Sequence, residues 1–116
     1  MPAIRDLIRA LRNRPGVDAA VVAGRDGLVI DAESDVDAER VAAHLPALIV
    51  AADDLGRALD RGALATLVVE HERGGLAVIS ALTPDVLLLV LLDPAADVGP
   101  LLGELRRDRA RLGTLV

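Results

Sequence analysis

Apolar residues recur along the first third of the chain at two spacings, one typical of helices and one typical of strands. In the segment 4–11 they follow the i, i+3, i+4, i+7 pattern that forms one stripe of a helix. The run 13–16, Asn-Arg-Pro-Gly, ends that helix. Residues 18–23 and 28–32 are then predicted as two strands of a hairpin, because Gly24-Arg25-Asp26-Gly27 between them carries the Asp-Gly turn signal.

A long helical pattern follows from about Ser34 to Leu59. Ser34 or Asp35 can cap its free N–H groups, and Arg61-Gly62 is a suitable end. Pro46 lies inside this pattern and removes one backbone hydrogen bond, at a cost of about 3 kcal/mol in a straight helix. We therefore expect either a kink at Pro46 or two abutting helices.

The last half of the chain predicts three strands and a helix. The strands are residues 65–72, 76–82 and 86–92. The unbroken apolar run 86–92 indicates a central strand covered on both faces, whereas the polar ends of 65–72 suit an edge strand. Asp97 can cap a final helix, with Pro100 tolerated in its first turn. Its apolar face would consist of Val98, Leu101, Leu102, Leu105 and Leu112.

The predicted order is therefore α-β-β-α-β-β-β-α, an α+β fold. A chain of 116 residues fits one domain over residues 1–116.

The middle helix is apolar on more than one face. One stripe should pack on the sheet, and its residues are Val41, Leu45, Leu48, Ala52, Leu55 and Leu59. The other side is also apolar, with Ala42, Ala43, Pro46, Ala47, Ile49 and Val50. Because a helix that is apolar on both faces needs cover on both, these residues predict contact with a second molecule, most simply an antiparallel copy of the same helix. The alternative is cover by another element of the same chain.

The predicted edge strand offers a second dimer surface. Pairing of this strand with its copy across a two-fold axis would continue the sheet and satisfy its open hydrogen-bonding groups. The residues that we assign to this contact are Thr66, Val68 and Glu70.

Composition excludes several functions. The formal net charge is −5 and the chain has no Phe, Tyr or Trp, which argues against nucleic acid as a partner. All thirteen basic residues are Arg, so the Lys of a P-loop or of a Schiff base is missing. The absence of Cys removes thiolate chemistry and fits a cytoplasmic protein. The longest apolar run, 86–92, is too short for membrane insertion.

Candidate chemistry is sparse. His44 on the middle helix and His71 on the predicted edge strand have acidic neighbours, but they lack the spacing of zinc ligands, so we expect no metal site. Hydroxyls occur only at Ser34, Ser80, Thr66, Thr83 and Thr114, and none lies in a nucleophile elbow. We therefore predict no catalytic residue, no cofactor and no enzyme. The basic run Arg106 to Arg111 is most simply a solvated helix face.

Three phrases of the chain resemble the Roadblock family. They are PGVDAAVVAGRDGLVIDAES, DAERVAAHLPALIVAADDLGRAL and LVVEHERGGLAVISALTPDVLLLVLLDPAADVGPLLGELRRDRARL. The resemblance implies a three-layer, Roadblock/profilin-like α/β/α sandwich with a five-stranded antiparallel sheet. It also implies dimers formed through the middle helices and the edge strand.

Bacterial members of the MglB type bind a Ras-like small GTPase across the paired middle helices and can stimulate its hydrolysis of GTP. Carried over, the resemblance implies a homodimer that regulates or scaffolds such a GTPase. The partner-binding positions would be Glu39, Arg40, Ala43, Ala47, Val50, Asp54 and Arg57. The alternative is a small-ligand sensor of related fold, which would need a cavity with convergent polar groups.

Overall fold

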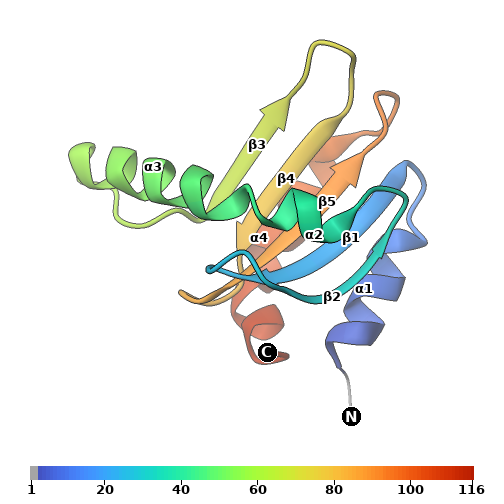
Figure 1. Cartoon of the computed structure of the whole chain (residues 1–116), viewed down its shortest axis with the longest axis horizontal. Helices are drawn as coiled ribbons and strands as arrows, with labels where there is room; N and C mark the ends of the chain where they lie inside the picture. Colours follow the sequence, from blue (N-terminus) through green and yellow to red (C-terminus); the bar gives the residue numbers. More distant parts are fainter. Residues whose placement is uncertain (1–2) are drawn as a thin grey trace.

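The computed structural model describes residues 3–116, which form an antiparallel sheet between two helical layers (Figure 1). The elements are α1 (Ile4–Arg12), β1 (Val17–Gly24), β2 (Val29–Ser34), α2 (Ala38–Ala42), α3 (Leu45–Ala58), β3 (Thr66–Glu70), β4 (Leu76–Ala81), β5 (Val86–Leu92) and α4 (Val98–Gly113). The strand order is β2-β1-β5-β4-β3, and all neighbours are antiparallel. The prediction of a central strand over 86–92 is confirmed. The predicted edge strand over 65–72 is also confirmed as an edge strand, but it is shorter and spans Thr66–Glu70.

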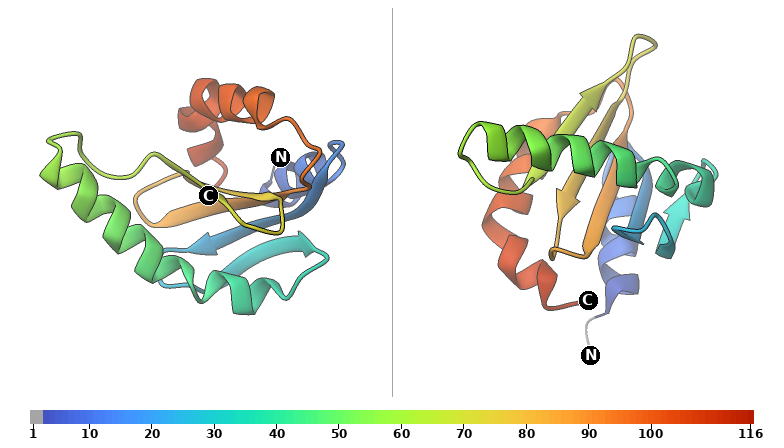
Figure 2. Two further views of the ribbon diagram at one scale, coloured as in Figure 1. Left: turned by 90° about the horizontal axis from the view of Figure 1, so that it is seen from above. Right: turned by 60° about the vertical axis from the view of Figure 1, so that its left-hand side comes forward.

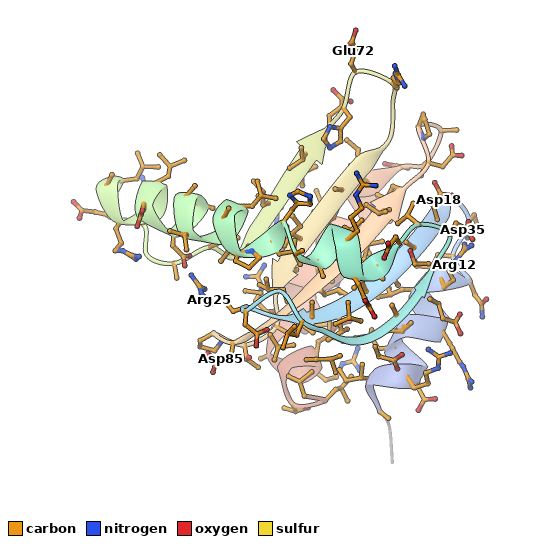
Figure 3. All side chains as sticks on the ribbon, viewed as in Figure 1. Arg12, Asp18, Arg25, Asp35, Glu72 and Asp85 are labelled. Carbon is orange, nitrogen blue, oxygen red and sulfur yellow. The ribbon has the colours of Figure 1, made fainter. Side chains whose placement is uncertain are left out.

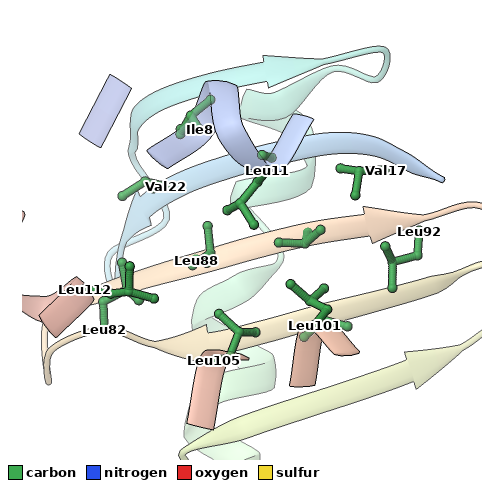
Figure 4. Packing of buried hydrophobic residues seen from close by; sticks show 13 residues of the cluster. Ile8, Leu11, Val17, Val22, Leu82, Leu88, Leu92, Leu101, Leu105 and Leu112 are labelled. Atoms are coloured by element: carbon green, nitrogen blue, oxygen red, sulfur yellow. The ribbon is translucent and has the colours of Figure 1, made fainter. Parts of the chain in front are cut away.

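The two faces of the sheet carry different helices, as Figure 2 shows: α1 and α4 lie on one face, α2 and α3 on the other. Alternation along β5 sends Leu88 and Val90 to the first face and Leu87 and Leu89 to the second, so the central strand contributes to both cores. Figure 4 shows the first core, in which Leu101 and Leu105 of α4 pack over the sheet beside α1. The predicted α/β/α sandwich is therefore confirmed.

The caps of the helices differ partly from expectation. Asp97 caps α4 as predicted, accepting a hydrogen bond from the Gly99 N–H at 3.0 Å. The cap of α2 is Asp37, whose carboxylate accepts from the Arg40 N–H at 3.2 Å. The prediction of Ser34 or Asp35 as this cap was wrong, because the Ser34 hydroxyl forms a local turn with the backbone of Val36.

The predicted break in the middle helix is confirmed as two abutting helices. α2 ends at Ala42, and α3 begins at Leu45 with Pro46 in its first turn, where a missing N–H costs nothing. The hairpin turn packs against this junction. Gly27 has a φ of +89°, and a Cβ there would lie 3.2 Å from both the Ala42 carbonyl oxygen and the Pro46 ring.

The structure corrects the predicted sheet-facing stripe of the middle helix. Ala42, Leu45, Ile49 and Asp53 are the buried residues of α2 and α3. Three leucines that were expected inside are exposed instead: Leu48 at 41%, Leu55 at 61% and Leu59 at 59%. The stripe was centred on the leucine-rich side around Leu48, whereas the buried side includes Asp53, whose carboxylate accepts hydrogen bonds from the Leu64 N–H and the Arg25 guanidinium.

None of the helices formed by residues 3–116 combines the length and apolar character needed to cross a membrane.

Candidate interaction surface

One side of α3 is both apolar and open to solvent. We call it the outer α3 face and define it as Ala43, Ala47, Leu48, Val50, Ala51, Leu55, Ala58 and Leu59, all of which are exposed. The last turns of α3 project past the edge of the sheet in each view of Figures 1 and 2. Soluble monomers rarely leave a row of exposed leucine and valine side chains on one helix, so this face is a candidate for contact with another protein.

An apolar groove runs beside this helix. The groove has a volume of about 390 Å³, with β-sheet residues as its floor and α2–α3 residues as its wall. Its lining is Val36, Val41, His44, Leu45, Leu48, Val69, His71, Ala77, Ile79, Leu89 and Leu91. Apart from the two histidines the lining is entirely aliphatic, which suits the apolar side chains of a protein partner better than a polar metabolite.

The two edges of the sheet differ in their protection. At the β2 edge, Arg5 of α1 binds Asp31 at 2.9 Å and Glu33 at 2.7 Å, and it also donates to the Ala32 carbonyl. Charged side chains along an edge strand are a usual way in which proteins prevent that strand from pairing with another chain. Across residues 3–116, no side chain makes a hydrogen bond of this kind to the backbone of β3. β3 is therefore the edge that remains able to pair.

A buried carboxylate fixes α3 in place. Asp53 is 4% exposed and accepts hydrogen bonds from the Leu64 N–H at 2.7 Å and from the guanidinium of Arg25. Figure 3 shows Arg25 reaching from the β1–β2 turn toward this helix. The backbone hydrogen bond from Leu64 and then the Arg25 guanidinium hold the pKa of Asp53 below its ordinary value. One side chain thus ties the hairpin turn, α3 and the α3–β3 loop together.

The residues predicted for the dimer contact are of three kinds, buried, half-buried and exposed. Ala42 and Ile49 are 0% and 1% exposed in the core of their own chain, so neither can meet a second molecule. Pro46 is half-buried, next to the Gly27 turn. Ala43, Ala47 and Val50 are exposed on α2–α3, and Val68 and Glu70 are exposed at the β3 edge, with Thr66 half-buried.

The charged positions predicted to bind a partner lie at the two ends of the apolar stretch. Glu39 and Arg40 are exposed on α2. Asp54 and Arg57 are exposed on α3 and form an ion pair at 3.3 Å. The sequence reasoning missed Leu48, Ala51 and Leu55 as surface residues, and only the correct rotation of α3 could have revealed them.

The two histidines lie on different elements but border the same groove. His44 is an exposed residue at the start of α3, and His71 follows directly after β3. Within residues 3–116, no group of three or more His, Cys, Asp or Glu side chains is arranged to hold a metal ion.

This fold, with one helical layer open on its outer side, defines a class of small α+β interaction domains. The sequence matches the Roadblock/LC7 domain over residues 3–92, and the chain belongs to that family. Members of the family are generally non-catalytic adaptor or regulator domains. No curated protein matches the sequence.

Solved structures share the fold. The gliding protein MglB from Thermus thermophilus superposes with a TM-score of 0.84 at 15% identity, over 96% of this chain and 86% of that one. A Roadblock/LC7 domain from Streptomyces avermitilis gives 0.77 at 26% identity, over 97% and 93% of the two chains. MglC from Myxococcus xanthus gives 0.62 at 20% identity, over 97% and 98%. The chain is therefore similar to whole Roadblock domains along nearly its full length.

Proposed function

We propose that the protein is a homodimeric interaction module that docks a Ras-like small GTPase as a regulatory or adaptor subunit. The observation that carries the proposal is the outer α3 face, a row of exposed aliphatic side chains on a helix whose opposite side is already packed on the sheet. Covering it would remove Leu48, Leu55 and Leu59 from water, and each buried leucine contributes on the order of 2 kcal/mol. In a homodimer each subunit covers the outer α3 face of the other, so this area is buried on both chains.

The charges that flank the outer α3 face favour an antiparallel arrangement of the two helices. An antiparallel copy brings Glu39 and Arg40 of one subunit toward Arg57 and Asp54 of the other, so that opposite charges meet at both ends of an apolar centre. The groove beside α3 would then receive apolar side chains from the second subunit. The paired helices would present a continuous surface to which a third protein would bind.

Seven positions are predicted to bind the GTPase: Glu39, Arg40, Ala43, Ala47, Val50, Asp54 and Arg57. In the proposed dimer the second subunit covers Ala43, Ala47 and Val50, so the GTPase would contact the charged positions at the ends of the paired helices. Family membership supports a protein as the ligand, and the similarity in fold to MglB supports a role in GTPase regulation as the proposal to test.

The dimer is tested by sedimentation. Ala47→Glu and Val50→Arg place a charge where the second copy would bury it, and each should weaken self-association by at least about a hundredfold. Ala10→Glu introduces the same charge as Ala47→Glu, at an exposed position of α1, and should leave the dimer intact. A wild-type protein that sediments as a monomer at high concentration would overturn the proposal.

The GTPase is tested with Ras-like GTPases encoded in the same genome, each loaded with GDP or with a non-hydrolysable GTP analogue. Binding by the wild-type dimer, measured by calorimetry, should depend on the nucleotide. It should weaken in Arg40→Glu and Arg57→Glu, each measured at a concentration at which sedimentation shows that the variant is still a dimer. GTP hydrolysis measured with and without the protein separates an activating subunit from an adaptor. Equal and negligible binding of every GTPase in both nucleotide states would contradict this part of the proposal.

A further inference from the structure

Arg109 is a cation without a charge partner. It lies on α4 and donates one hydrogen bond to the Thr66 hydroxyl of β3, at 2.9 Å. Its Nε is buried and has no hydrogen-bond partner, and within residues 3–116 Arg109 forms no ion pair. A half-buried guanidinium with unused donors is costly unless an acceptor, best a carboxylate, completes it. The position at the free edge of the sheet indicates that the acceptor comes from outside the chain.

The β3 edge has a defined set of open backbone groups. The Ala81 N–H donates to the Ala65 carbonyl and the His71 N–H donates to the Gly75 carbonyl, so odd-numbered residues of this strand bond to β4. In an antiparallel ladder alternate residues direct both backbone groups to the same side. Thr66, Val68 and Glu70 therefore direct their N–H and C=O groups to the free edge.

The side chains of these three residues share one face of the sheet. Thr66 is contacted by Arg109 of α4, and Val68 lies opposite Val78, which belongs to the core beneath α1 and α4. Glu70 follows by alternation and is exposed, and it forms no ion pair with residues 3–116. A cation and an anion thus lie near opposite ends of the same short strand.

Two copies of β3 that pair antiparallel about a two-fold axis can adopt few registers. Centring on Val68 pairs the whole strand, Thr66–Glu70, with its copy and forms about six backbone hydrogen bonds. Centring on Leu67 or Val69 leaves part of the strand unpaired. Centring on Val69 would also place Val68 opposite a glutamate.

We propose that β3 pairs with its copy with Val68 on the two-fold axis, and that Arg109 of each subunit forms an ion pair with Glu70 of the partner subunit. In this register Thr66 lies directly opposite Glu70 of the partner subunit, with Cα atoms about 5.5 Å apart. Arg109, already bonded to Thr66, then reaches that carboxylate, and symmetry repeats the contact. The inference rests on the proposed dimer and adds the register and the charge contact that selects it.

Single cysteines report the register directly, because the natural chain has none. Val68→Cys should form a disulfide-linked dimer under mild oxidation, since a residue on the axis meets its own copy within disulfide distance. Leu67→Cys and Val69→Cys are matched controls that would cross-link only in the two neighbouring registers. Preferential cross-linking at position 67 or 69, with a dimer still present by sedimentation, overturns the register and leaves the proposed dimer standing.

Charge reversal tests the ion pair. Glu70→Arg and Arg109→Glu should each weaken the dimer by roughly tenfold, because each leaves like charges facing one another. The double variant Glu70→Arg/Arg109→Glu restores opposite charges and should recover most of the affinity, which a merely structural role for either residue would not produce. Additive losses in the double variant overturn the contact, and a monomeric wild type overturns both the contact and the dimer.

Discussion

At the scale of single residues, Asp53 shows how a charge can belong to a core. On folding, the carboxylate of Asp53 exchanges hydrogen bonds with water for hydrogen bonds from the Leu64 N–H and the Arg25 guanidinium. These two partners lie on segments far apart in the sequence. Folding therefore stabilises the charged form, and the pKa of Asp53 lies below its ordinary value. The cost of burying the charge is offset by contacts that exist only in the folded chain.

We predict that Asp53→Asn lowers the thermal unfolding midpoint by several degrees at neutral pH. A carboxyl whose pKa is depressed by folding stabilises the protein fully above its unfolded pKa, near 4, and this stabilisation is lost as pH falls through the folded value. The difference between wild type and variant should therefore shrink below about pH 4. Scanning calorimetry at several pH values measures the difference in unfolding midpoint between wild type and Asp53→Asn. Asp54→Asn, a substitution of the exposed neighbour, is the control. A difference that is constant with pH would contradict the prediction.

Gly27 is the second residue whose context decides its role. Its φ of +89° disfavours any side chain, and a Cβ would lie 3.2 Å from the Pro46 ring and from the Ala42 carbonyl oxygen, so these neighbours would have to shift by a few tenths of an ångström. We predict that Gly27→Ala destabilises the protein by about 2–3 kcal/mol, of which about 1 kcal/mol reflects backbone strain. Gly62 has a φ of +81° and open space around a Cβ, so Gly62→Ala should cost only the backbone strain, about 1 kcal/mol. Equal losses for both variants in urea unfolding would show that the turn does not press on the helix junction.

At the scale of elements, the cap of α2 was predicted a few residues too early. Ser34, Asp35 and Asp37 are all acceptable capping types, and the choice among them depends on where the chain leaves β2. β2 continues to Ser34, whose hydroxyl bonds Val36, so Asp37 is the first residue able to reach a free N–H of the helix.

We predict that Asp37→Ala lowers the free energy of unfolding by about 1 kcal/mol, the usual loss for an N-cap. Glu39→Ala removes a first-turn charge without a cap hydrogen bond and should cost only a few tenths of a kcal/mol. Urea unfolding of both variants provides the comparison. A larger loss in Glu39→Ala than in Asp37→Ala would contradict the assignment of the cap.

At the scale of the whole molecule, the sheet has one protected edge and one open edge, and the outer α3 face lies on the same side of the protein as the open one (Figure 1). Both surfaces can be covered by a single copy related by a two-fold axis. The proposed dimer would therefore be stabilised by association, because only the folded form binds.

We predict that the thermal unfolding midpoint rises by several degrees between about 1 µM and about 100 µM protein, as mass action requires for a dimer. Ala47→Glu should show a much smaller rise of the midpoint with concentration, since it weakens the association by at least about a hundredfold. Differential scanning fluorimetry over this range gives the measurement. A wild-type midpoint that is constant with concentration would count against self-association.

The sequence by itself determined the elements, their order and the positions of two strands in the sheet: an unbroken apolar run must be central, and a strand with polar ends suits an edge. It also determined the break at Pro46, because proline geometry is local. These features depend on residues close together in the chain, so periodicity and turn chemistry suffice to predict them.

Only the tertiary structure decided which side of α3 is buried. A helical wheel with apolar residues nearly all round has no unique inward direction, and the deciding contacts of Asp53 come from Arg25 and Leu64. The same holds for Arg109, which belongs to a basic run in sequence but contacts Thr66 across 43 positions of the chain. Such contacts depend on the folded arrangement of distant segments, which no local pattern encodes.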